Sequence, residues 1–476
     1  MDQADAAPQR GSLDDVVARL ERLPLASAVR RLVIVLALGC FFENYFLLMT
    51  AYVAPGMVKS GIFVAKASSF FDLHSVGFFI LSGFTGMMVG SSIFGFFADR
   101  FGRRPIFVWA MLWYSVTTAI MALQSEAIAC DLWRFVSSIG LGLELVVVNS
   151  YVTELASSRV RGRAVALYQF TALLSVPLVA FASMILTPLS LFGVDGWRWV
   201  MFAGSAGVII VWWLRRRLPE SPRWLATMGR AAEADAVLCD IERTMERELG
   251  QPLPTPVAVS RSTAKAPAAA VTAAVGSFAE LFRVPYRRRT LMFIIQQLFM
   301  PIAFYGFQAW VPTLLIAKGV AVTESLFYAF LIAFATPASP LVMSLFADRF
   351  DRKAQIAFGA VASALFIAAF TLLSSPALVV TFGLLVTFCK SIITTAIANY
   401  MPECYPTRIR GRGHGLVYGV SRVMAAFSGL LIAYALGFGG IEAVGLVIFV
   451  SFTVVALITL ALGPSVKGRT LEEISP

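Results

Sequence analysis

Long apolar runs recur along the whole chain, and they constrain its fold more than any other feature. A helix needs about 20 mainly apolar residues to cross a membrane, and about twelve runs of this kind are present. They lie near residues 32–54, 76–97, 105–124, 131–153, 164–187, 198–214, 290–315, 324–346, 354–373, 377–400, 415–436 and 440–462. Because backbone groups in lipid must be satisfied within their own segment, each run is predicted to be a helix. The sequence therefore predicts an all-α membrane protein with about twelve transmembrane helices.

The composition agrees with this prediction and excludes several classes of protein. Hydrophobic residues make up 58% and charged residues 14% of the 476 residues, whereas soluble domains carry about 25% charged residues. The net charge of +11 does not indicate nucleic-acid binding, because the arginines gather in loops on one side of the predicted membrane. That asymmetry predicts a multi-pass protein of the cell (inner) membrane with both termini in the cytoplasm. The five cysteines show no metal-binding spacing, so we expect free thiols and no metal.

Two charged motifs occur twice in the chain. The stretch Gly-Phe-Phe-Ala-Asp-Arg at Asp99 returns as Ser-Leu-Phe-Ala-Asp-Arg at Asp348, 249 residues later. Glu154 with Arg161 returns at the same offset as Glu403 with Arg410. Two motifs at one offset indicate homologous halves, an arrangement found in many secondary transporters. The predicted units are two pseudo-symmetric six-helix bundles at 32–214 and 290–462, a cytoplasmic helical linker at 215–289, and cytoplasmic ends at 1–31 and 463–476.

The motifs resemble those of the major facilitator superfamily. The loop motif of that family between helices two and three is matched by Gly95, Asp99, Arg100, Gly102, Arg103 and Arg104. Signatures of its sugar-porter branch are matched by Glu154 with Arg161, by Pro219–Trp224, by Glu403 with Arg410 and by Leu471–Ile474. The resemblance covers nearly the whole chain. It implies a transporter that works by alternating access.

Part of the pattern departs from sugar porters and is similar to bacterial metabolite:proton symporters. Sugar porters usually follow the two glutamines of helix seven with Gly and Asn. Here Gln296 and Gln297 run into Leu298 and Phe299, which weighs against a hexose substrate. The stretch from Tyr305 to Pro312 and the Arg422 of helix eleven look more like the symporter branch.

The repeated charged residues are predicted to gate the transporter. The resemblance implies that they close one bundle against the other at the cytoplasmic face, and alternating access needs contacts that form in only one state. The alternative is that these charges only fix the topology. Asp351 replaces the Gly of the motif in the second copy, so that hinge is predicted to be degenerate. The predicted gating residues are Gly95, Asp99, Arg100, Gly102, Arg103, Arg104, Glu154, Arg161, Asp348, Arg349, Arg352, Glu403 and Arg410.

Four ionisable residues lie at membrane depth, namely Glu43, Glu144, Lys390 and Arg422. A charge at the bilayer centre costs ~2.5–3.5 kcal/mol, so they are expected to face a wet cavity or one another. Both acids are in the first half and both bases in the second. We expect Glu144 or Glu43 to carry a coupled proton, and Lys390 with Arg422 to attract an anionic substrate. The alternatives are a static Glu144–Lys390 pair and an Arg422 side chain that reaches the interface.

Further polar residues at membrane depth are candidates for binding the substrate, although packing between helices explains such residues too. The resemblance implies that helices one, four, seven and ten line the central cavity. Glu43, Glu144, Gln297 and Lys390 provide one polar residue at depth on each of them. The candidates beyond the ionisable residues are Gln296, Gln297, Gln308, Asn149, Gln169 and Tyr305.

These observations predict a secondary active transporter that couples proton symport to a small organic acid or related metabolite. A sugar or polyol transporter, either a symporter or a facilitator, is the alternative. An enzyme is not expected, because no cluster of catalytic residue types is present. The expected partners are a small-molecule substrate and the lipid bilayer, without nucleic acid. A monomer is expected, driven by the proton gradient and without a cofactor.

Overall fold

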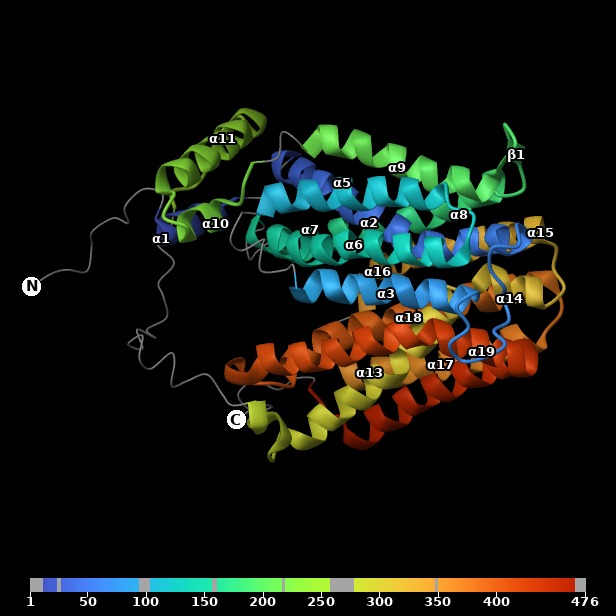
Figure 1. The fold of residues 1–476 in the computed structure, drawn as a ribbon. Coiled ribbons are helices and arrows are strands. Elements are labelled where there is room, and N and C mark those ends of the chain that lie inside the picture. Colours follow the sequence, from blue (N-terminus) through green and yellow to red (C-terminus); the bar gives the residue numbers. More distant parts are fainter. Residues whose placement is uncertain are drawn as a thin grey trace, which may run out of the picture.

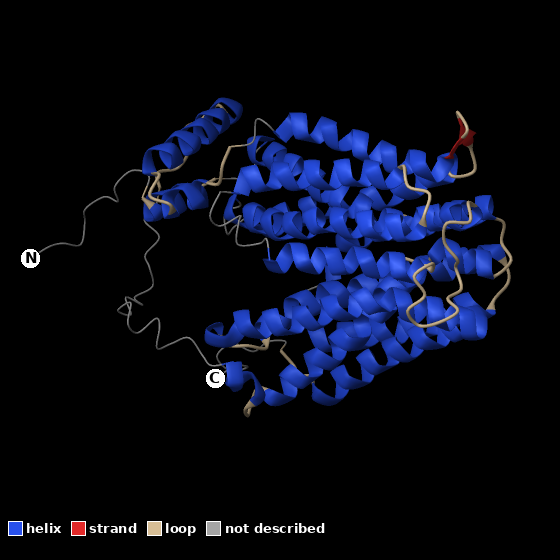
Figure 2. Ribbon diagram, viewed as in Figure 1, coloured by secondary structure: helices blue, strands red, loops and turns tan. Residues whose placement is uncertain are grey.

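The computed structural model describes residues 12–23, 27–93, 103–155, 161–215, 219–256, 278–346 and 350–466. This part of the chain is almost entirely helical (Figure 2). Most helices run side by side in one direction, with the first half of the chain above the second in Figure 1. The β1–β2 hairpin marks one end of the molecule, called here the hairpin end. The helices α10 and α11 mark the other, called the linker end (Figure 1).

The first bundle is formed by the helices before the linker. A short hairpin, β1 (Ser190–Leu191) with β2 (Val194–Asp195), joins its last two helices. The helices are α2 (Ser27–Lys59), α3 (Val76–Ile93), α5 (Arg103–Ala122), α6 (Ala127–Leu155), α7 (Arg161–Leu173), α8 (Ser175–Leu186) and α9 (Gly196–Arg215).

The second bundle follows the linker. Its helices are α13 (Arg287–Gln308), α14 (Val311–Ala317), α15 (Val322–Ala333), α16 (Ala335–Phe346), α17 (Arg352–Leu372), α18 (Pro376–Glu403) and α19 (Thr407–Leu462). The backbone of α19 is non-helical at Gly439 and Gly440, where φ of Gly440 is 64°, so this element contains two spans. Eight described helices are long and apolar enough to cross a membrane. The predicted all-α fold of two pseudo-symmetric bundles is confirmed.

Three predicted spans are each divided into two helices, and proline explains the positions of the breaks. Proline cannot donate to the carbonyl four residues before it. In each case a proline lies four residues after the last residue of the first helix: Pro177 after Leu173 of α7, Pro312 after Gln308 of α13, and Pro337 after Ala333 of α15. The proline therefore cannot donate the helical hydrogen bond to the carbonyl of that last residue. Each span thus continues across the membrane as a bent pair of helices.

The two bundles meet most closely near the hairpin end. Helix α3 packs on α19, α8 on α15, and α2 on α14. The approach of α3 and α19 depends on glycine, because a Cβ added to Gly77 would lie 2.6 Å from the backbone oxygen of Gly429. The backbone nitrogen of Ala67 also donates to the Ala433 oxygen at 3.3 Å. The hairpin end is therefore closed in this state.

A helical cap lies on the first bundle at the linker end, to the left of α2 and α5 in Figure 1. It consists of α1 (Leu13–Glu21), α10 (Pro222–Thr227) and α11 (Ala231–Leu249). Gly229 adopts a φ of 74° and separates α10 from α11. Helix α1 was not predicted.

Arg19 of α1 ties the cap together. Arg19 is 7% exposed, and its guanidinium pairs with Asp235 at 2.5 Å and with Glu242 at 2.8 Å. Arg22 donates to the same Glu242 at 2.6 Å. Burial alone would raise the pKa of Glu242, but the hydrogen bonds from Arg19 and Arg22 hold it below its ordinary value. The contribution of this lowered pKa to stability is present near neutral pH and is lost as the pH falls through the lowered value.

We expect Arg19→Gln to release α1 from α11. Removing one partner of a buried ion pair costs about 3–5 kcal/mol, because the carboxylates stay buried without their cation. Hydrogen exchange should then become faster in residues 13–21 while the α2–α9 helices keep their protection. Arg31→Gln is the matched control, since Arg31 pairs with Glu248 at 3.4 Å but its side chain is 75% exposed. Unchanged exchange in Arg19→Gln would contradict this account of the cap.

Candidate functional site

A cavity of about 220 Å³ lies between α13, α18 and α19 of the second bundle. Its wall is mostly apolar and contains a group of aromatic rings. Tyr418 is 43% exposed on this wall, whereas Trp310, nearer the hairpin end, is fully buried. The cavity therefore belongs to the half of the molecule nearer the linker end. Its lining residues are Gln297, Met300, Pro301, Phe304, Tyr305, Thr394, Ile397, Ala398, Met401, His414, Tyr418 and Ser421.

Arg422 adds a positive charge to the edge of this cavity. Its guanidinium lies 4.6 Å from the centre of the Tyr418 ring and donates to the Tyr418 hydroxyl. The Tyr305 hydroxyl is within hydrogen-bonding reach of the same guanidinium. Arg422 also lies within electrostatic reach of Glu43 on α2. The predicted acid of the first bundle and the predicted base of the second thus lie within electrostatic reach of each other.

Lys390 is deeper than Arg422 and is held inside its own bundle. It is 1% exposed, donates to the side-chain oxygen of Gln308, and lies 4.3 Å from the centre of the Phe304 ring. Both of these partners are on α13. The described contacts of Lys390 are therefore with α13 of its own bundle. A static pair with Glu144 would instead join Lys390 to α6 of the first bundle.

The two membrane acids belong to one buried polar cluster of the first bundle. Glu43 is 3% exposed and Glu144 is fully buried. Both carboxylates are within electrostatic reach of the Cys40 thiol and of the Tyr168 hydroxyl. Asn44 donates to the Cys40 sulfur at 3.3 Å. Helices α2, α6 and α7 thus bring two acids and two weaker acids together, a set of groups that can hold and pass a proton.

The remaining predicted binding residues are divided between the cavity and the helix packing. Gln297 and Tyr305 line the cavity. Gln296 is fully buried and donates to the Thr459 hydroxyl at 2.5 Å, so its described contact is with α19. Gln169 is exposed on α7, and Asn149 lies on α6 in a stretch whose side chains are outside the described set.

Only part of the predicted gate falls within the described residues. Arg352 pairs with Glu403 at 3.7 Å, and the Arg410 guanidinium donates to the Tyr405 oxygen at 3.3 Å. Both contacts are within the second bundle, and the Arg352–Glu403 pair connects its two repeated motifs. Six of the predicted gating residues lie outside the described residues, namely Gly95, Asp99, Arg100, Gly102, Asp348 and Arg349. Four more lie in described helices, but their own side chains are outside the described set, namely Arg103, Arg104, Glu154 and Arg161.

Arg134 is the principal residue that the sequence analysis missed. Helix α6 begins at Ala127, so Arg134 lies about two turns inside the helix. It is 2% exposed and donates to the backbone oxygens of Phe46 at 3.0 Å and Leu47 at 3.3 Å. The signal in the sequence for a buried role of Arg134 is a charged residue two turns inside a mainly apolar run.

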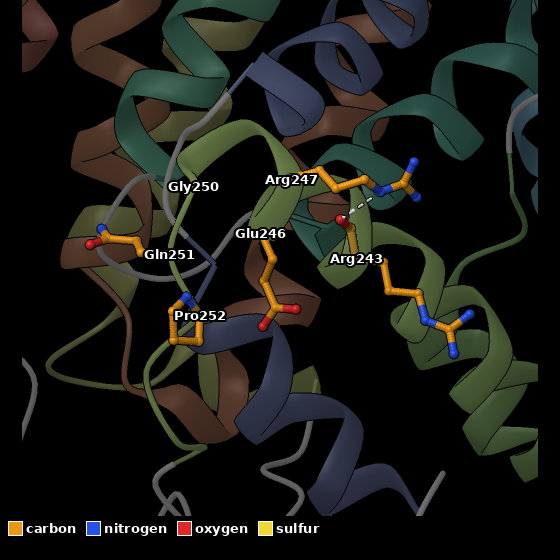
Figure 3. Close-up of a pocket in the computed structure, with 6 residues that line it drawn as sticks. All are labelled: Arg243, Glu246, Arg247, Gly250, Gln251 and Pro252. Carbon is orange, nitrogen blue, oxygen red and sulfur yellow. Dashed lines mark hydrogen bonds between the residues drawn. The ribbon is translucent and has the colours of Figure 1, made fainter.

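A second hollow of about 530 Å³ lies on the cap, away from both bundles. Figure 3 shows its side chains, with the Arg247 guanidinium directed to the backbone oxygen of Arg243. The Glu246 carboxylate accepts from the Leu253 backbone nitrogen at 3.1 Å, so it stabilises the end of α11. This hollow lies outside both bundles, whereas the cavity beside Arg422 lies among membrane-spanning helices and is the better candidate for a transport site.

The comparison with protein families decides what kind of protein carries this cavity. The model of the family "Sugar (and other) transporter" matches residues 32–476. The chain belongs to this family. It is therefore a membrane transporter of the major facilitator superfamily, similar to the sugar porters, and not an enzyme.

Relatives of this family member match it over nearly their whole lengths. The putative metabolite transport protein YyaJ of Bacillus subtilis is 29% identical, with 95% of this chain and 96% of that protein covered. The inner membrane metabolite transport protein YdjE of Escherichia coli is 28% identical, with 97% and 98% covered. The crystal structure of a D-xylose-proton symporter has a TM-score of 0.68 at 18% identity, with 92% and 98% covered. The last likeness shows a shared fold.

Proposed function

We propose that this transporter couples the movement of a proton to that of a small organic acid by alternating access. The observation that carries the proposal is the Arg422 guanidinium stacked on Tyr418 beside a mostly apolar cavity, within electrostatic reach of Glu43 on the other bundle. An acid that exchanges a proton and a base that binds an anion are then electrostatically linked. We further propose that the protein works as a monomer, without a cofactor, with its linker end and both termini in the cytoplasm.

The lining of the cavity supports an acid more than a sugar. A sugar brings many hydroxyl groups, and each one buried without a partner costs about 1–3 kcal/mol. Half of the lining residues carry a hydrogen-bonding side chain, but the exposed wall of the cavity is mainly apolar. A carboxylate on an apolar body needs one strong cation, which Arg422 provides through charge-assisted hydrogen bonds.

The charges suggest an order of events. With Glu43 ionised, its charge competes with a substrate anion for Arg422. When a proton neutralises Glu43, Arg422 is released to bind the carboxylate, and the loaded site carries less net charge through the membrane. The two bundles then rock about the bound substrate. Return of the ionised Glu43 to Arg422 favours release on the other side.

A sugar or polyol transporter is the alternative function. Gln297 favours it, because a side-chain amide in the cavity offers both donors and an acceptor to hydroxyl groups. The likeness to a D-xylose-proton symporter is a likeness of fold. The two functions differ in whether binding needs the positive charges of the second bundle.

We expect carboxylates, and not sugars or polyols, to raise the melting temperature of the purified protein. A ligand present at 100 times its Kd stabilises the folded state by about 2.7 kcal/mol. Lys390→Gln should reduce this stabilisation, because the lysine charge contributes to the positive potential of the cavity. Lys318→Gln is the control, since Lys318 donates to the backbone oxygens of Phe370, Thr371 and Leu373 at 2.9, 2.8 and 2.7 Å, away from the cavity. Stabilisation by a neutral sugar that survives Lys390→Gln would support the alternative function.

A further inference from the structure

A second, closed cavity lies on the hairpin-end side of Tyr305. It has a volume of about 10 Å³, the lower limit for one water molecule. Its walls come from both bundles, with Thr50, Gly83 and Arg134 from the first and Tyr305 from the second. Because the two bundles separate at one end or the other during alternating access, a cavity between them near the hairpin end enlarges when that end opens.

Two polar groups in this small cavity have no hydrogen-bond partner. They are the Nε of Arg134 and the hydroxyl of Thr50, in side chains that are 2% and 3% exposed. Burying a polar group without a partner costs about 1–3 kcal/mol, and more when the group is charged. The other two nitrogens of the guanidinium are used on the α2 backbone, which holds Nε in a fixed direction. The protein therefore maintains an oriented, positively charged donor that the described state does not use.

Tyr305 separates this cavity from the one beside Arg422. Its ring lines both cavities and packs edge-on against Phe84, with ring centres 4.5 Å apart. Phe84 belongs to α3 of the first bundle, so the aromatic pair crosses the interface between the bundles. A substrate moving between the two ends of the molecule has to pass this pair, with Arg422 on one side and Arg134 on the other.

We propose that Arg134 and Thr50 form a second anion-binding site, which receives the substrate carboxylate when the hairpin end is open. This site rests on the proposed function, because the anion it binds is that of an organic acid. The carboxylate is held by Arg134 in the state open at the hairpin end and by Arg422 in the state described here. Tyr305 contacts the substrate in both states, and the Tyr305–Phe84 pair closes behind it.

The test uses thiol reagents of opposite charge on a cysteine placed in the small cavity. Thr50→Cys is introduced, and intact cells are treated with a membrane-impermeant sulfonate or trimethylammonium methanethiosulfonate. We expect the anionic reagent to react faster, and the ratio of the two rates to fall about tenfold or more when Arg134→Gln is added. Arg134→Lys keeps the charge and should keep most of the ratio. The unsubstituted protein gives the background from the native cysteines.

A surface cysteine controls for access and for charge elsewhere. Ser69 is exposed in the loop before α3, so Ser69→Cys should react with both reagents at a ratio that Arg134→Gln leaves unchanged. Equal ratios for Thr50→Cys with and without Arg134→Gln would overturn the proposal. So would a Thr50→Cys that never reacts while Ser69→Cys does. Neither measurement uses an organic acid, so a failure here is distinct from a failure of carboxylates to stabilise the protein.

Discussion

Glu144→Gln is expected to abolish accumulation of the substrate in response to a pH gradient while leaving exchange of substrate across the membrane. The glutamine keeps the shape of the carboxyl group but cannot take up or release a proton. Binding of proton and substrate in such systems is typically coupled by about 1–3 kcal/mol, a factor of about 5–150 in affinity. In proteoliposomes of the Glu144→Gln protein, the stimulation of uptake by an imposed pH jump should therefore be lost. The rate of substrate counterflow in a uniform buffer should stay unchanged.

Glu43→Gln separates the roles of the two acids. If Glu43 competes with the substrate for Arg422, its neutralisation should also lower the substrate KM and remove the dependence of KM on pH. Glu144→Gln leaves the Glu43 carboxylate in place, so the competition of Glu43 with the substrate for Arg422 should persist. Glu324→Gln is the matched control, because Glu324 is an exposed carboxylate in the first turn of α15. Full pH-driven accumulation in both Glu144→Gln and Glu43→Gln would rule out this cluster as the proton carrier.

The features predicted correctly from the sequence are those that depend on local pattern. Each span was visible because a run of about 20 apolar residues is long enough to be distinctive. The breaks at Leu173, Gln308 and Ala333 were also within reach, since each lies four residues before a proline. The placement of acids in one half and bases in the other predicts a site between the bundles; Arg422 lies within electrostatic reach of Glu43, and their roles stay predictions.

The missed features depend on contacts between distant parts of the chain. Arg19 meets Glu242, 223 residues later, and no local pattern indicates that pairing. Arg134 is one charge near the start of a span, which hydropathy alone treats as a topology signal. Gln296 and Gln297 are neighbours in the sequence, yet only Gln297 lines the cavity, because the helical turn directs Gln296 to Thr459. Packing decides which face of a helix lines a cavity, and the hydropathy of the sequence does not show this.

Arg422→Gln is expected to weaken substrate binding more than any other single change in the second bundle. A hydrogen bond to a charged group contributes about 1.5–3 kcal/mol, which corresponds to a loss of about 10–150-fold in affinity. The proposed competition between the Glu43 carboxylate and the substrate anion also depends on Arg422, so removal of Arg422 ends that competition. We therefore expect both a higher KM and a weaker dependence of uptake on pH.

Arg422→Lys tests whether charge alone is enough. Lysine keeps the charge but loses the planar guanidinium that stacks on Tyr418 and presents several donors to a carboxylate. Partial recovery of affinity is therefore expected, with KM between those of the native protein and Arg422→Gln. Arg198→Gln is the matched control, because the Arg198 guanidinium donates to the backbone oxygens of Ala122 and Gln124 at the hairpin end. An Arg422→Gln transporter with native KM and native pH dependence would remove the cation from the site, and with it the reason to expect an acidic substrate.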